Sequence, residues 1–143
     1  MKKTIVFCCV LISLKLMAQS SPGSVTLQNK VLSLTFDLNR GSYAIRNIAD
    51  NVTLISDAYF QAEGLYSTDT TGTMEWSRQE VNGMFGRGEA LRIRKKFDSY
   101  SDMVWTATLY DEKDFVVLNM GIINDSQIPF RLTAFYPLKT KSS

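Results

Sequence analysis

The stretch GMFGRGEALRIRKKFDSYSDMVWTATLY, residues 83 to 110, indicates the fold of this 143-residue chain. Apolar side chains occupy alternate positions in both of its halves: Leu91, Ile93 and Phe97, then Met103, Trp105, Ala107 and Leu109. A period of two is typical of a β-strand with one buried face. The stretch therefore predicts two consecutive strands, 91–97 and 103–110.

Three glycines precede the first of these strands. Phosphate-binding loops require G-x-x-x-x-G-K-[ST], and dinucleotide-binding loops require G-x-G-x-x-G at the start of a helix. Gly83, Gly86 and Gly88 have the spacing G-x-x-G-x-G, and a strand pattern follows them. We therefore interpret them as a turn, a bulge or a close approach of two backbones.

Similar patterns extend over most of the chain. Residues 30–38 alternate, Asn39-Arg40-Gly41 predicts a tight turn, and 42–48 supply the partner strand. Further strands are expected over 52–63, 115–123 and 128–138, with a polar loop over 65–73. Strands every 8 to 14 residues without a helix predict an all-β fold, an antiparallel β-sandwich.

The last predicted strand, 128–138, is expected to place Phe130, Leu132, Ala134 and Tyr136 on one face. Pro129 and Pro137 then lie near its two ends, where a missing N–H matters least.

The first 18 residues have the layout of a secretory signal peptide. Lys2 and Lys3 precede an apolar run over 5–14, and Ala18 is a small residue suited to cleavage. We expect residues 19–143 to form a single β-sandwich domain that is secreted or periplasmic. Cleavage would remove both cysteines and leave 13 basic against 14 acidic residues. This balance gives no electrostatic reason to expect nucleic acid or, after cleavage, a membrane as partner.

The composition also limits the chemistry. There is no histidine, and both cysteines lie in the signal segment, so we expect no zinc or copper site, no other cofactor and no nucleophile–histidine catalysis. The acidic group Asp111, Glu112 and Asp114 lacks the EF-hand pattern and is interpreted as a hairpin tip. Glu63, Glu75 and Glu80 are the first acids to test for a catalytic pair, but the pattern identifies no catalytic residue.

Aromatic residues are concentrated between positions 57 and 76, where the strand pattern is weakest. Tyr59, Tyr66 and Trp76 are candidate carbohydrate contacts, because exposed aromatic rings stack on the apolar faces of sugars. The alternative is that Tyr59, Phe60 and Trp76 belong to the core.

A basic run follows the glycines. Arg92, Arg94, Lys95 and Lys96 are interpreted as the solvated face of a strand rather than as an anion site.

The segment FVVLNMGII, 115–123, is apolar on both faces. Such a strand is expected to be covered on both sides. Either it is central in the sandwich, or the face with Val116, Leu118, Met120 and Ile122 contacts a partner. That partner is then a catalytic barrel domain or a second copy of the chain.

The order of segments resembles the N-terminal β-sandwich of family 36 glycoside hydrolases, the α-galactosidase and raffinose-synthase-like enzymes. The resemblance covers about 25–138 and rests on Gly86-x-Gly88-x-x-Leu91, Leu109-Tyr110-Asp111, and Asn124-x-Ser126 before Pro129-Phe130. It implies a galactose-mutarotase-like supersandwich.

In that family the two catalytic aspartates lie on a separate barrel that follows the sandwich. The resemblance therefore implies an accessory domain or fragment of a carbohydrate-active enzyme that is not catalytic by itself. A stand-alone carbohydrate-binding module with exposed aromatic residues is the alternative.

Overall fold

The computed structural model describes residues 23–98, 100–125, 129 and 131–140. The predicted signal peptide lies outside these residues. The described residues form ten strands and no helix, and so contain no helix that could cross a membrane. The predicted antiparallel β-sandwich is confirmed.

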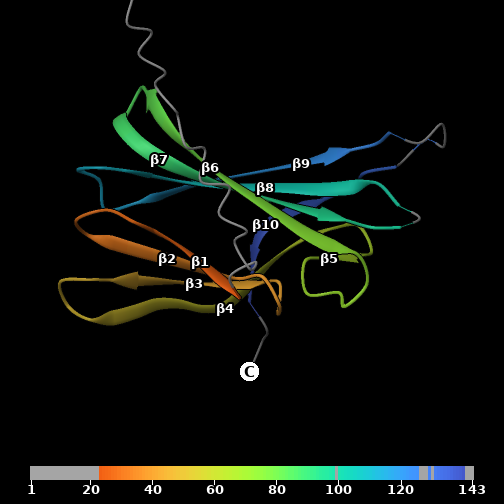
Figure 1. The fold of residues 1–143 in the computed structure, drawn as a ribbon, viewed down its shortest axis with the longest axis horizontal. Helices are drawn as coiled ribbons and strands as arrows, with labels where there is room; N and C mark the ends of the chain where they lie inside the picture. The colour runs from red at the N-terminus through yellow and green to blue at the C-terminus, as the bar shows by residue number, and fades with distance from the viewer. Residues whose placement is uncertain (1–22, 99, 126–128, 130, 141–143) are drawn as a thin grey trace, which may run out of the picture.

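Two antiparallel sheets face each other as layers (Figure 1). The first sheet has the order β1-β2-β3-β4-β10, with the short β5 also paired to β4. Its strands are β1 (Ser24–Gln28), β2 (Leu32–Asp37), β3 (Ser42–Asn47), β4 (Val52–Ala62), β5 (Leu65–Tyr66) and β10 (Phe135–Lys139). The second sheet has the order β6-β7-β8-β9 and consists of β6 (Thr73–Gly83), β7 (Gly86–Lys96), β8 (Asp102–Tyr110) and β9 (Val116–Ile123).

The glycine stretch forms the hairpin between β6 and β7. Gly83 pairs with Gly86 across a two-residue loop, and Gly86 has a φ of 104°, which favours glycine. A Cβ at Gly88 would lie 2.3 Å from the carbonyl oxygen of Leu109 on β8. The interpretation as a turn and a close backbone approach is confirmed.

The core lies between the sheets and is centred on Trp105 of β8. The rings of Phe36, Tyr43 and Phe60 from the first sheet lie 4.7 to 5.8 Å from its ring, centroid to centroid. The predicted inward positions of β7 and β8, and Phe97 directly after β7, are buried: Leu91, Ile93, Phe97, Met103, Trp105, Ala107 and Leu109. The alternating residues of β2 face them across the sandwich.

The last strand differs from its prediction. β10 begins only at Phe135, so Leu132 and Ala134 precede it, and Phe130 lies outside the described residues. Tyr136 is 42% exposed, and Pro137 lies within the strand at a β-bulge rather than near its end. The single shared face predicted for 128–138 is therefore wrong, because residues 131–134 lie outside the strand and only Tyr136 of the described members belongs to it.

Lys95 also differs from its prediction. It lies on the same inward side of β7 as Ile93 and Phe97 and is only 4% exposed. Its Nζ donates a hydrogen bond to the carbonyl oxygen of Asp69 at 2.7 Å. Burial lowers the pKa of Lys95, an effect opposed by the Asp69 carboxylate. The long aliphatic stem allows a lysine to occupy a core position while its ammonium reaches a polar partner.

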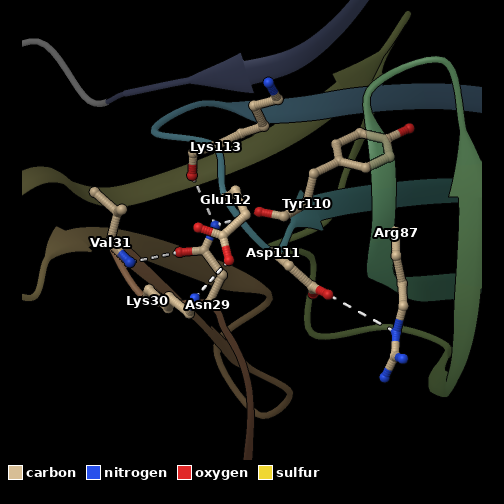
Figure 2. A network of polar contacts seen from close by, with 8 residues as sticks. All are labelled: Asn29, Lys30, Val31, Arg87, Tyr110, Asp111, Glu112 and Lys113. Atoms are coloured by element: carbon tan, nitrogen blue, oxygen red, sulfur yellow. Dashed lines mark hydrogen bonds and ion pairs between the residues drawn. The ribbon is translucent and has the colours of Figure 1, made fainter.

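Asn29 joins the two sheets at one end of the sandwich (Figure 2). Its Oδ1 accepts hydrogen bonds from the backbone N–H groups of Val31 and Leu32, at 2.8 and 2.7 Å. Its Nδ2 donates to the carbonyl oxygens of Tyr110 and Lys113, at 2.7 and 2.8 Å. One side chain thus connects the β1–β2 turn to the β8–β9 turn.

We expect Asn29→Ala to reduce the free energy of unfolding by about 2–3 kcal/mol, because it removes four hydrogen bonds and leaves part-buried backbone groups without partners. Asn29→Asp is expected to cost at least as much, because it directs a carboxylate at two carbonyl oxygens. Asn47→Ala is the control, since the half-buried Asn47 side chain accepts a single, solvent-exposed 3.2 Å bond from the backbone N–H of Asp50. Urea unfolding measures all three, and equal midpoints for Asn29→Ala and Asn47→Ala would contradict the prediction.

The apolar strand β9 lies at the edge of its sheet, paired with β8. Val116, Leu118, Met120 and Ile122 are half-buried and pack against the core. Val117 and Ile123 on the opposite face are half-buried as well. The face with these four residues, for which a central place in the sandwich and contact with a partner were the two alternatives, is therefore turned toward the first sheet.

We expect Val116→Thr with Leu118→Thr to destabilise the fold by about 2–4 kcal/mol, since the pair buries hydroxyl groups and loses core packing. A denaturant melt measures this cost. A double variant that keeps its midpoint and gains solubility would show that these side chains form a free surface patch instead.

Candidate functional site

Tyr59 and Tyr66 lie together on the outer face of the first sheet. Ala58, Phe60 and Ala62 of β4 are buried, so the alternating Tyr59 and Gln61 point away from the core. Tyr66 of β5 pairs with Gln61 and therefore shares this outer face. The rings of Tyr59 and Tyr66 lie 6.3 Å apart at an angle of 43°.

The neighbouring strand β10 adds Tyr136 and Lys139 to the same face. Tyr136 pairs with Gln61, and Lys139 pairs with Tyr59. The ammonium of Lys139 lies 4.8 Å from the centre of the Tyr136 ring and donates to Gln61 Oε1 at 3.0 Å. We call the set Tyr59, Gln61, Tyr66, Tyr136 and Lys139 the tyrosine face.

The β-bulge in β10 makes this arrangement. With a regular ladder after Tyr136, Leu138 would lie opposite Tyr59, but the extra residue places Lys139 there instead. The bulge therefore directs a cation to the outer face, and Leu138 is left facing β9.

Gln61 is the buried centre of the tyrosine face. It is 8% exposed, and its Nε2 donates to the carbonyl oxygen of Glu63 at 3.2 Å. Tyr66 and Tyr136 flank it on the two adjacent strands, which places their backbones two strand spacings, about 10 Å, apart. They are 36% and 42% exposed, so their rings are accessible on either side of a fixed amide.

Glu63 joins the β4–β5 turn to the segment before β10. Its Oε1 accepts hydrogen bonds from Thr133 Oγ1 at 2.5 Å, from the Thr133 N–H, and from the Ala134 N–H at 3.1 Å. These bonds, with Thr133 first, lower the pKa of the Glu63 carboxyl. The Glu63 carboxylate therefore fixes the start of β10, which carries Tyr136, relative to the turn that leads into β5, which carries Tyr66.

The β5 hairpin is also fixed from its other side. Asp69 Oδ2 accepts the Tyr66 N–H at 3.1 Å, and Ser67 Oγ donates to the Gly41 carbonyl oxygen at 2.7 Å. The loop predicted over 65–73 thus begins with a short strand, β5, and Ser67 next to it holds it against β4: its N–H donates to the Phe60 carbonyl oxygen and its Oγ accepts the Phe60 N–H. The tyrosine face is preorganised, which lowers the entropic cost of binding a ligand.

Trp76 lies apart from the other two predicted contacts. It belongs to β6 in the second sheet, pairs with Ile93, and packs half-buried against the core. The Arg78 guanidinium lies 5.9 Å from the centre of its ring. This placement agrees with the core alternative for Trp76 rather than with an exposed platform.

The remaining polar candidates do not come together. Glu63 lies in the β4–β5 turn, Glu75 forms an ion pair with Lys96 at 2.6 Å, and Glu80 pairs with Glu89 in the register of β6 and β7. Among the described residues no group of acidic or other ligating side chains has the geometry of a metal site. The tyrosine face presents aromatic rings, an amide and an ammonium, groups that stack and form hydrogen bonds.

Sequence reasoning identified two of the five residues of the tyrosine face. The alternation in 58–62 could have added Gln61, since it places Gln61 on the side of Tyr59. Tyr136 and Lys139 are three positions apart and share a face only because of the bulge. No pattern in the sequence indicated that bulge.

Comparisons with protein-family models, with curated proteins and with solved structures find no match to this chain.

We expect Glu63→Gln to lower the melting temperature at neutral pH, because the neutral amide accepts weaker hydrogen bonds from Thr133 and Ala134. The folded-state pKa of Glu63 is depressed, so its contribution is present above the unfolded pKa of about 4.3 and is lost as the pH falls through the folded value. The difference between wild type and variant should therefore shrink in acid. Thermal melts across this pH range test it, and a difference independent of pH would contradict it.

Proposed function

We propose that this chain is a non-catalytic accessory domain of a carbohydrate-active enzyme and that its tyrosine face binds an oligosaccharide. The observation that carries the proposal is the placement of Tyr59, Tyr66 and Tyr136 around the buried amide of Gln61 on an outer sheet face. The resemblance of the segment order to the front sandwich of α-galactosidase-type enzymes supports the enzymatic context.

The chemistry of the face suits a sugar chain. Sugar rings have apolar C–H faces and hydroxyl edges, and tyrosine offers an apolar ring with a polar tip. Tyr66 and Tyr136 supply two ring surfaces, while the Lys139 ammonium next to Tyr136 is a donor for hydroxyl oxygens. Because the exposed rings lie on the outer surface of a sheet, we expect the face to bind internal units of an extended chain.

The alternative function is a stand-alone carbohydrate-binding module. It uses the same face, and the two proposals differ only in whether a catalytic barrel accompanies the domain. An in-frame barrel downstream of position 143 favours the accessory domain. In either case the purified chain is expected to release no galactose from an aryl α-galactoside, and turnover lost on mutating one of its own carboxylates would overturn both.

We expect Tyr66→Ala and Tyr136→Ala each to weaken oligosaccharide binding about tenfold, which corresponds to about 1.4 kcal/mol of binding free energy. Both side chains lie on the outer face of the sheet and outside the core, so the fold should be retained. The control is Phe85→Ala, which removes a 38% exposed aromatic from the β6–β7 hairpin, outside the tyrosine face.

Isothermal titration against galactosides and plant oligosaccharides, with circular dichroism of each variant, makes the measurement. No saturable binding by wild type, or equal losses in Tyr66→Ala and Phe85→Ala, would contradict the proposal.

A further inference from the structure

Within the described residues, three of the four sheet edges carry features that prevent pairing with another strand. β1 has only five residues, and the Arg78 guanidinium donates to the carbonyl oxygen of Thr26 on it. β6 carries Glu75, Arg78 and Glu80, and β10 contains Pro137 and Lys139. Short length, charge and proline are the usual protections of an edge strand.

The fourth edge, β9, has none of these features. Its sequence, VVLNMGII, contains no charged residue and no proline over eight residues. Among the described residues only β8 pairs with it, and β10 contacts it without a ladder of hydrogen bonds. An uncharged apolar strand with an unpaired edge is a template for a further strand.

The register identifies the backbone groups at this edge. The N–H of Asp111, the residue after β8, donates to the carbonyl oxygen of Arg87 on β7. In an antiparallel ladder alternate residues bond to the same neighbouring strand, so the odd-numbered residues of β8 are bonded to β7. The intervening residues, among them Thr106 and Thr108, are bonded to β9 through Asn119 and Val117. The N–H and C=O groups directed away from the sheet therefore belong to the alternate residues Val116, Leu118, Met120 and Ile122.

We propose that two copies of this chain pair antiparallel through β9. The register that pairs all four outward residues places Val116 opposite Ile122 and Leu118 opposite Met120, with Asn119 facing its own copy on the two-fold axis. Every cross-strand pair is then apolar or amide–amide, and no like charges meet. The two second sheets join into one continuous sheet through an isologous interface.

The surface beside the strand favours the same partner. A groove of about 230 Å³ runs between β9 and the first sheet and is lined mainly by apolar residues, including Leu54, Phe115 and Leu138. These three side chains are 55%, 36% and 38% exposed. The inward side chains of a second β9 would extend the inner face of the sheet toward this groove, as expected for strand addition with pockets for alternate side chains.

The test changes the outer face of β9 without touching the core. Asn119 is exposed, and a Cβ at Gly121 meets no atom within 4 Å, so Asn119→Glu with Gly121→Glu fits the fold. The matched control is Val104→Glu with Thr106→Glu, at the two positions paired with Gly121 and Asn119 on the interior strand β8. Both variants add the same charge to the same face, but only the first adds it at the edge.

Sedimentation velocity over a concentration series gives the dimer dissociation constant. We expect a dimer for the wild type and the β8 control, and a dissociation constant raised at least about tenfold for the β9 variant, since like charges meet across the symmetric pair. A monomeric wild type, or equal dissociation constants for the two variants, would overturn the proposal. Asn119→Cys in a Cys8→Ser, Cys9→Ser background should form a disulfide-linked dimer, and Thr106→Cys should not; equal cross-linking by both would likewise overturn it.

Discussion

The carbonyl oxygen of Pro137 links the two sheets through a pair of buried hydrogen bonds, and the position of the last strand depends on it. It accepts a hydrogen bond from Tyr43 Oη of the first sheet at 2.8 Å and one from Trp105 Nε1 of the second at 3.0 Å. Both donors are buried among aromatic rings, where an unpaired polar group costs about 1–3 kcal/mol. Burial also raises the pKa of the Tyr43 hydroxyl well above its ordinary value, an effect that its contact with Trp105 only partly offsets, so this donor stays protonated.

This constraint determines where β10 lies. The carbonyl must reach between the sheets while the strand stays paired to β4, and the bulge between Tyr136 and Lys139 meets both conditions. Proline has no N–H to leave unpaired at this position. The same bulge places Lys139 beside Tyr136 and Gln61, so the tyrosine face on the outside follows from the hydrogen bonds of the core on the inside.

The two proposed interactions use separate parts of the sandwich. The tyrosine face lies on the outer surface of the first sheet, over β5, β4 and β10, whereas the β9 edge belongs to the second sheet. Pairing through β9 therefore leaves the tyrosine face accessible, and a dimer would present two of them. Two linked sites can raise the overall affinity for an extended ligand without any new contact, if the ligand reaches both.

The sequence by itself determined the fold class, most strands and the glycine turn, because side-chain alternation and turn chemistry are local properties. It determined the inward residues of β7 and β8 for the same reason. Lys95 is the exception, because its charge indicated the solvated face although the side chain occupies a core position. Tertiary structure alone decided that Trp76 packs on the core while Tyr59 and Tyr66 meet on another sheet, since strand order depends on contacts between distant segments. It alone brought Tyr136 and Lys139 to that face, because a bulge forms when a strand must satisfy partners in both sheets, and no short stretch of sequence contains those partners.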